Sequence, residues 1–216
     1  RIAGLFERGE GVPQDDRRAR EWFKRGADLG DAGAMASLGA YMADGRGGPR
    51  DAEQAVRLYR RAAADGVGAA MFGLARALER GEGVAQDRAQ ALACYRDGVS
   101  AGSADCMVRL AALLEADARG RPEPIAEAAD LYRRAAEAGH VTGMNNWAHA
   151  LANGEGVARD EAQAVAWYRR AAEAGSSATS MVNYALFLRD GRGVPRDPAE
   201  AARWLRRAVD LGDDRA

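Results

Sequence analysis

Residues 34–47 read AMASLGAYMADGRG, and this stretch decides the fold because close variants of it return along the whole chain. Met35, Leu38, Gly39 and Met42 follow the i, i+3, i+4, i+7 spacing of one face of an amphipathic helix. The glycines that follow permit positive φ and favour the end of that helix. We therefore expect a first helix that ends in a glycine loop.

A second helix is expected after Asp51, whose short carboxylate suits an N-cap. Ala55, Leu58, Tyr59 and Ala62 then lie on one stripe, and the segment stops at the pair 65–66, Asp-Gly. Each unit of the chain is therefore predicted to be a helical hairpin.

The hairpin recurs about every 36 residues. The loop returns as GEGVPQD at 9–15, GEGVAQD at 81–87, GEGVARD at 154–160 and GRGVPRD at 191–197. Methionine, glycine and tyrosine each keep a register of their own: Met35, Met71, Met107, Met144 and Met181; Gly30, Gly66, Gly102, Gly139, Gly175 and Gly212; Tyr59, Tyr95, Tyr132 and Tyr168. Three coincident registers indicate a true repeat.

Some positions are small in every unit, which indicates close packing of helix axes. They are Gly39, Ala75, Ala111, Ala148 and Ala185 in the first helices, and Ala19, Ala55, Ala91, Ala128, Ala164 and Ala201 in the second helices. Because one hairpin cannot bury its own apolar face, the units are expected to stack into a superhelix with a concave and a convex side.

The pattern resembles the Sel-1-like repeat family, a relative of the tetratricopeptide repeats. Residues 34–47 and the stretch AVAWYRRAAEAG at 164–175 are similar to the two helices of that repeat. The resemblance implies an all-α fold, a right-handed α-α superhelix, and a single solenoid domain over residues 1–216. Its units would be a truncated copy at 1–31 and full copies at 32–67, 68–103, 104–140, 141–176 and 177–216.

The same resemblance implies a non-catalytic adaptor or scaffold with a protein or peptide ligand, in many cases bacterial. Because the chain begins at Arg1, a signal or anchor can lie outside it, and the compartment stays open between bacterial cytoplasm and periplasm. Two departures stand out: a longer loop at 117–125 with Pro122 and Pro124 stiffening it, and one extra residue at the joint 175–180.

Composition disfavours several other classes of function. The chain has 31 basic and 32 acidic residues, so it lacks the positive field that gathers nucleic acid. No apolar run approaches the roughly 20 residues that cross a bilayer. Cys94 and Cys106 are too few for a disulfide framework or a zinc site, and we interpret them as buried free thiols. We expect no nucleic acid, no membrane insertion, no metal and no cofactor.

Positions that differ from repeat to repeat are not needed for the packing that all repeats share. They are therefore the candidates for binding a partner. By analogy with tetratricopeptide proteins, the groove-facing positions of the first helices carry the candidate partner-binding residues: Arg109, Asn145, Asn146, His149, Asn183, Arg76 and Phe72. Asparagine amides can pair with a peptide backbone, and arginine can grip a carboxylate. Arg80 and Glu79 would extend this groove. The alternative, which the family resemblance suggests for the Asn146 site, is that the amide there only bonds a neighbouring helix.

Other interpretations remain open. A glycan-binding protein of the cell wall would need an aromatic platform near Trp147 or Phe72, and we expect Trp147 to be core. A cell-wall hydrolase is less favoured because no nucleophile and base, and no pair of carboxylates, stands out. The final helix, expected over 198–211, would expose Ala201, Trp204, Leu205 and Ala208. This end would then either continue in a longer chain or pair with another molecule, including a second copy.

Overall fold

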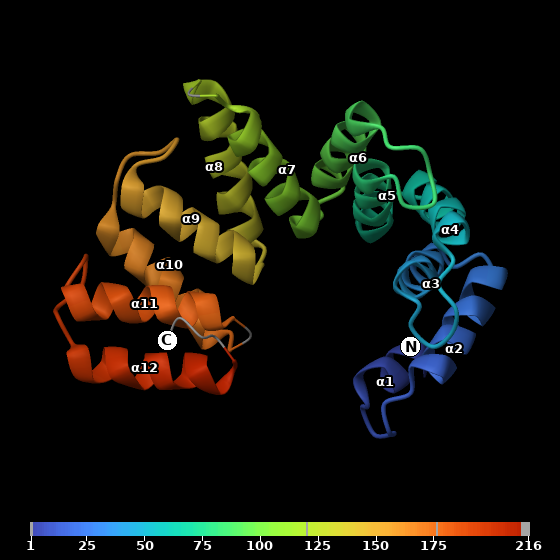
Figure 1. The fold of residues 1–216 in the computed structure, drawn as a ribbon, viewed down its shortest axis with the longest axis horizontal. Helices are drawn as coiled ribbons and strands as arrows, with labels where there is room; N and C mark the ends of the chain where they lie inside the picture. Colours follow the sequence, from blue (N-terminus) through green and yellow to red (C-terminus); the bar gives the residue numbers. More distant parts are fainter. Residues whose placement is uncertain (1, 120, 176, 213–216) are drawn as a thin grey trace. The chain divides into compact units, whose positions relative to one another are not determined.

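The computed structural model describes residues 2–119, 121–175 and 177–212, and every regular element in these ranges is an α-helix (Figure 1). The helices are α1 (Ile2–Arg8), α2 (Asp16–Asp28), α3 (Ala32–Asp44), α4 (Ala52–Ala64), α5 (Gly68–Arg80), α6 (Arg88–Ser100), α7 (Ala104–Asp117), α8 (Pro122–Glu137), α9 (Val141–Asn153), α10 (Glu161–Glu173), α11 (Ala178–Asp190) and α12 (Pro198–Asp210). The predicted helical hairpins are confirmed. We call the odd-numbered helices from α3 onward the A helices, and the even-numbered helices the B helices.

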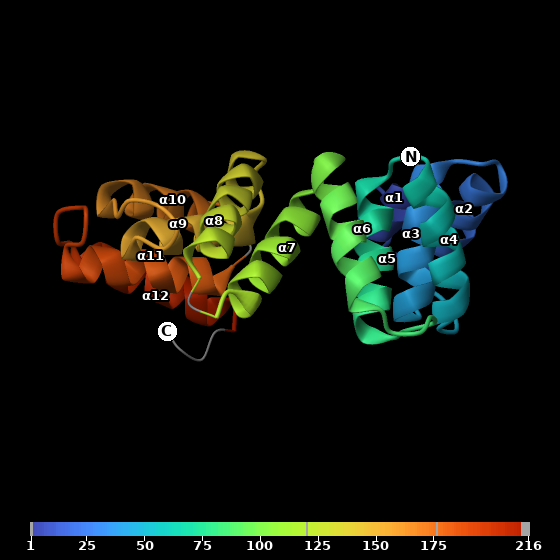
Figure 2. The same ribbon diagram turned by 90° about the horizontal axis from the view of Figure 1, so that it is seen from above.

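The helices form two compact units, 1–106 and 107–216, and the border falls within α7. In the first unit each helix from α1 to α6 packs against the next, and the A helices α3 and α5 also touch (Figure 1). In the second unit α8 to α12 follow one another in the same way, as Figure 2 shows from another side. The single domain over 1–216 stays a prediction.

Aspartate N-caps start the B helices as the sequence predicts. The side chains of Asp15, Asp51, Asp87, Asp160 and Asp197 each accept a hydrogen bond from a backbone N–H in the first turn. His140 caps α9 similarly, since its Nδ1 accepts from the Gly143 N–H at 3.2 Å. His140 is therefore the N-cap that starts α9 after the end of α8.

The two glycines of each loop have different structural roles. The first, as at Gly81, is left-handed with φ 72° and ends its A helix. The second, as at Gly83, also has positive φ, but a Cβ on it would lie 2.3 Å from the backbone of Ala52 at the start of α4. Equivalent contacts at 2.2–2.4 Å occur at Gly47, Gly156 and Gly193. Each loop therefore lies directly on the preceding B helix.

Small side chains and the tyrosine register build the core. The small positions of both helices are buried throughout, and so are Tyr59, Tyr95, Tyr132 and Tyr168. The ring of Tyr59 fits between Gly39 and Gly73, where a Cβ would lie 2.7 Å and 2.6 Å from ring atoms. Trp147 is only 7% exposed, which confirms that it belongs to the core.

Where a B helix ends against the start of the next A helix, the facing residues complement each other in size. Gly98 faces Cys106, and Gly143 faces Ala135; a Cβ on either glycine would come within 3 Å of that partner. The larger residue sits on α7 in the first pair and on α8 in the second. At each of these two joints the glycine leaves the space that the facing side chain fills.

Two sequence expectations are wrong in detail. Pro122 and Pro124 do not stiffen a loop: α8 begins at Pro122, where proline at the helix start loses no hydrogen bond. Cys94 is only half-buried, although Cys106 is buried and both thiols are free. The prolonged stretches at 117–125 and 175–180 include Gly120 and Ser176, which lie outside the described residues.

The last helix also differs from expectation. Ala201, Trp204 and Ala208 are buried because α12 packs on α11, and Leu205 is half-buried. The exposed apolar side chains of this segment are instead Val209 and Leu211. Self-association through this end stays a prediction, but most of the apolar surface on which that prediction was based is buried against α11.

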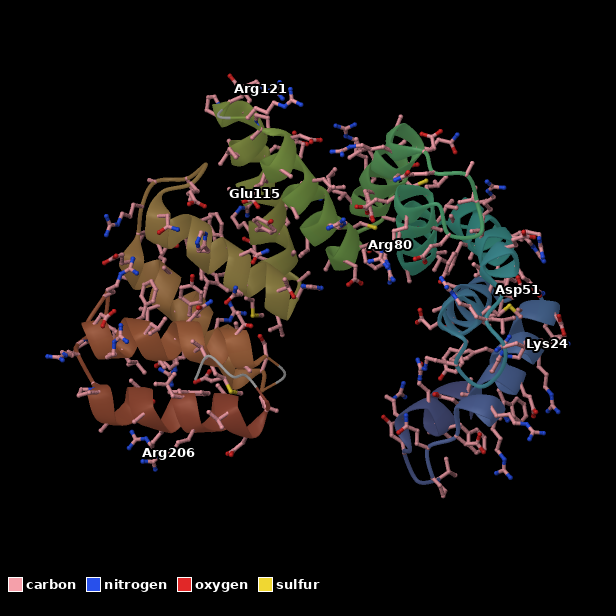
Figure 3. The ribbon with its side chains drawn as sticks, in the orientation of Figure 1. Lys24, Asp51, Arg80, Glu115, Arg121 and Arg206 are labelled. Atoms are coloured by element: carbon pink, nitrogen blue, oxygen red, sulfur yellow. The ribbon has the colours of Figure 1, made fainter. Side chains whose placement is uncertain are left out.

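Removing one aspartate cap should weaken the fold measurably. In Asp51→Ala the N–H of Gln54, now 2.9 Å from Asp51 Oδ1, loses its acceptor. We expect a loss of about 1 kcal/mol in the free energy of unfolding, measured by urea titration of the full chain. Asp51→Asn keeps an acceptor oxygen and should retain most of the stability; equal losses in both variants would contradict a capping role for Asp51, labelled in Figure 3.

The loop glycines offer a matched pair of substitutions. Gly81→Ala meets no atom closer than 3.3 Å, so we expect only the cost of positive φ, about 1–2 kcal/mol. Gly83→Ala adds a backbone clash and should cost roughly 1–3 kcal/mol more. Urea unfolding midpoints of the two variants decide the point, and a smaller loss at position 83 than at 81 would refute the close contact.

Candidate functional site

The A-helix face of the first unit is hollowed between α3 and α5. We call this the Arg76 hollow. It encloses about 360 Å³ and is lined by Glu7, Gly33, Ala36, Ser37, Ala40, Tyr41, Arg46, Tyr59, Val67, Ala69, Phe72, Gly73, Arg76 and Asp105. Most of the α3 and α5 residues on it are small, which leaves space above the Tyr59 ring. The structure thus brings the predicted residues Phe72 and Arg76 together.

Arg76 lies along the aromatic side of the hollow. Its guanidinium carbon is 5.7 Å from the centre of the Phe72 ring, and Phe72 in turn tilts against Tyr95 at 6.1 Å between ring centres. Burial raises the pKa of Tyr59 to about 12, while the charge of Arg76 acts in the opposite direction. Among the described residues, the buried Nε of Arg76 has no hydrogen-bond partner.

The other arginine of the hollow is fully engaged. Arg46 Nη2 lies 2.7 Å from Asp16 Oδ1, and Arg46 Nη1 lies 3.5 Å from Glu7 Oε1. Tyr41 donates its hydroxyl to the same Asp16 oxygen at 3.1 Å. The hydrogen bond from Arg46 lowers the pKa of Asp16, so this carboxylate is charged at neutral pH. Arg46 therefore ties the loop to α2.

The second unit has a hollow that shares three register positions with the Arg76 hollow, since Tyr132, Asn146 and His149 correspond to Tyr59, Gly73 and Arg76; we call it the Tyr132 hollow. It encloses about 390 Å³ and is lined by Glu115, Ile125, Tyr132, Asn146, His149 and Glu155. The Tyr132 hydroxyl donates to Glu115 Oε2 at 2.8 Å, and Figure 3 labels Glu115 on α7. Burial and then this bond raise the pKa of Tyr132, while the neighbouring Asn146 amide lowers it. Here the predicted residues Asn146 and His149 lie together.

His149 is exposed and sits among polar groups at the end of α9. Its Nδ1 is 3.3 Å from Glu155 Oε2, and Asn153 Nδ2 lies 3.0 Å from its Nε2. Glu155 is the middle residue of the glycine loop, the position that Arg46 and Arg192 hold in other units. Because this position is a glutamate here, the loop places a carboxylate beside the ring of His149.

The remaining asparagines bind each other. Asn183 on α11 donates from Nδ2 to Asn145 Oδ1 on α9 at 2.9 Å, and both side chains are half-buried. This bond links two consecutive A helices of the second unit. Asn145 and Asn183 therefore join neighbouring helices and do not line the hollow that holds Asn146, the site for which the sequence left a helix-joining role open.

The other predicted residues lie outside both hollows. Arg109 is half-buried on α7 and has an interaction of its own, so it is not a free cation. Glu79 accepts the Tyr95 hydroxyl at 2.9 Å. Arg80, labelled in Figure 3, is exposed near Glu82. Neither extends the hollow as predicted.

Sequence reasoning missed Tyr132, Glu115 and Glu155 as lining residues. For Glu115 and Tyr132 a signal was present in the sequence spacing. A glutamate precedes a tyrosine by 16 residues at Glu79 and Tyr95, and by 17 residues at Glu115 and Tyr132. The tyrosine register predicted core packing, which is correct for the ring. The hydroxyl end nevertheless reaches the hollow.

Cys106 is buried outside both hollows, and burial raises the pKa of its thiol to about 11, which keeps it protonated and unreactive. Within the described ranges, no group of His, Cys, Asp and Glu is arranged to hold a metal ion. Trp147, being buried, offers no platform for a sugar ring.

None of the described helices has both the length and the apolar character required to cross a bilayer.

Comparison with solved structures shows the fold. The chain is similar to a protective antigen present in uropathogenic Escherichia coli strains, which displays an SLR fold (27% identity, TM-score 0.76, 98% of this chain and 45% of that one). This chain therefore spans less than half of that antigen. A Sel1 repeat protein from Oxalobacter formigenes gives a TM-score of 0.77 at 24% identity, over 96% of this chain and 82% of that one. An immunity protein from Pseudomonas aeruginosa gives 0.57 at 20%, over 84% and 66%.

Among curated proteins, none matches the chain. The Sel1 repeat, in contrast, matches six times, over residues 1–31, 32–67, 68–103, 104–140, 141–176 and 178–213. The predicted fold class, an all-α Sel1 repeat solenoid, is confirmed. Sel1 repeats typically serve as protein-interaction scaffolds and are generally non-catalytic. With repeats matched from end to end, the chain belongs to the Sel1 repeat family.

Proposed function

We propose that this chain is a non-catalytic scaffold that binds a peptide or protein segment on the A-helix faces of its two units. The observation that carries the proposal is the position of the two hollows. Apart from Tyr59 and Tyr132, the residues that line them mostly vary between repeats, while small residues recur beneath them and tyrosine recurs at Tyr59, Tyr95, Tyr132 and Tyr168. Such variable side chains contribute little to the common packing, so they are available to recognise a partner.

The side chains on these faces suit a polypeptide ligand. The Tyr132 hollow offers an amide at Asn146, a carboxylate at Glu115 and a ring nitrogen at His149. These groups can donate to and accept from a peptide backbone. The Arg76 hollow adds an aromatic wall and a cation. Aromatic residues and arginine are the side chains most often found at the centre of protein interfaces.

Substituting the Tyr132 hollow should remove partner binding without unfolding the chain. The full chain, immobilised, is exposed to lysate of the source cells, and retained proteins are quantified by mass spectrometry. We expect Asn146→Ala combined with His149→Ala to lower the retention of specific partners about tenfold or more, because contacts at an interface centre often contribute over 1 kcal/mol each.

Arg169→Ala on α10 is the matched control, since its side chain is 63% exposed on a B helix and lines neither hollow. It should retain the same proteins as wild type. Circular dichroism melting checks that the double variant stays folded. Equal retention by the folded double variant and wild type would refute binding at the Tyr132 hollow.

The asparagine pair separates structure from binding. Asn145→Ala deprives Asn183 Nδ2 of its acceptor, so we expect a loss of about 1 kcal/mol in unfolding free energy. A double-mutant cycle with Asn183→Ala should then show a coupling of the same order. Retention of partners should stay at the wild-type level. Unchanged stability together with lost retention would instead assign these amides to the partner interface.

A further inference from the structure

Two arginines, Arg46 and Arg76, line the Arg76 hollow, and they differ in their counter-ions. Arg46 is paired with Asp16 and Glu7, whereas no ion pair involves Arg76 anywhere in residues 2–119, 121–175 and 177–212. Its Nε is also buried and makes no hydrogen bond to a described residue. A buried donor without an acceptor is costly, so native structures rarely keep one unless another group supplies the acceptor.

The acidic residues near Arg76 are engaged elsewhere or lie too far away. Glu7 contacts Arg46, and Glu82 contacts Arg50 at 3.3 Å. Asp105 has an interaction of its own. Asp44 faces the adjoining space beside Tyr59, but no ion pair joins it to Arg76. The acceptor for Arg76 therefore has to come from outside these side chains.

The surroundings of Arg76 specify the chemistry of that acceptor. A guanidinium is a planar fork that fits a carboxylate with two parallel hydrogen bonds. The hollow around it is lined by aliphatic side chains, including Ala36, Ala40 and Val67, with the Phe72 ring beside the guanidinium. Apolar walls exclude water and strengthen a charged contact. They also provide a surface for an aliphatic side chain of the ligand.

We infer that the Arg76 hollow binds a carboxylate that stands next to an aliphatic side chain in a partner segment, with Arg76 as the anchor. This inference rests on the proposed function and specifies its ligand in the first unit. The carboxylate is supplied either by an Asp or Glu side chain or by the C-terminus of the segment.

Three short peptides distinguish these sources. Ac-ALEL-NH2 carries a side-chain carboxylate, Ac-ALAL-OH carries a terminal one, and Ac-ALQL-NH2 carries neither. Each is titrated into the ¹⁵N-labelled full chain, and the backbone amide signals of Ser37, Phe72, Gly73 and Arg76 are followed. We expect at least one carboxylate peptide to shift these signals, with an affinity about tenfold or more above that of Ac-ALQL-NH2.

Variants on α5 locate the effect. Arg76→Gln should lower the affinity for the carboxylate peptide to that of Ac-ALQL-NH2, and Arg76→Lys should restore only part of it, because an ammonium keeps the charge without the fork. Arg80→Gln, on the same helix but outside the hollow, should bind as wild type. The dispersion of the amide spectrum verifies that each variant is folded.

The inference is overturned if Ac-ALQL-NH2 binds as tightly as both carboxylate peptides, if Arg76→Gln leaves affinity unchanged, or if no peptide shifts these signals up to about 10 mM. The proposed function fails differently. It is contradicted when the folded Asn146 and His149 double variant retains partners like wild type, and that measurement does not involve Arg76.

Discussion

The structure depends on the contact between the second glycine of each loop and the start of the preceding B helix. At Gly47, Gly83, Gly156 and Gly193 there is no room for a Cβ, because backbone atoms of the earlier repeat lie within 2.4 Å of where it would be. The contact is made by main chain, so its geometry does not depend on which side chains surround it. The contact holds each loop against the preceding B helix. It thereby sets the spacing between the A helices within a unit.

That fixed spacing separates two roles along the A helices. Residues such as Ala75 and Ala148 face the core and are fully buried, whereas Arg76 and His149, the residues that follow Ala75 and Ala148, border the hollows. The groove positions can therefore change in charge and size while the core stays the same. In this chain the position that follows the buried alanine is arginine in the Arg76 hollow. In the Tyr132 hollow it is histidine, and two glutamates line the same hollow.

Much of the fold could be predicted because its signals are local. A loop glycine ends a helix, and an aspartate caps the next one, through atoms only a few residues apart. Burial of Trp147 followed from its register alone. The start of α8 at Pro122 was missed because the same proline suits both a stiff loop and a first helical turn.

The candidate site was less predictable because it depends on which side chains meet. The asparagines share similar positions on successive helices, yet Asn145 and Asn183 bond each other while Asn146 faces a hollow. Which amide turns inward is decided by side-chain conformations that periodicity does not encode. The exchange of size between Gly98 and Cys106, or Ala135 and Gly143, is similarly invisible in any single position, because only the pair is constrained.

The middle residue of the glycine loop has one more consequence. In two repeats it is an arginine that pairs with the first residue of the preceding B helix: Arg46 with Asp16, and Arg192 with Glu161 at 2.7 Å. In the repeat with Glu82 the middle residue instead contacts Arg50 of the preceding loop at 3.3 Å, and in the repeat with Glu155 it contacts His149 of the same repeat at 3.3 Å. Dissolved salt screens contacts between partly exposed charges, but it does not weaken the main-chain contact of the second loop glycine. Rising ionic strength should therefore loosen the loops at 45–51, 81–87 and 191–197, whose charged contacts join consecutive repeats, more than the loop at 154–160, so that the response to salt differs from repeat to repeat.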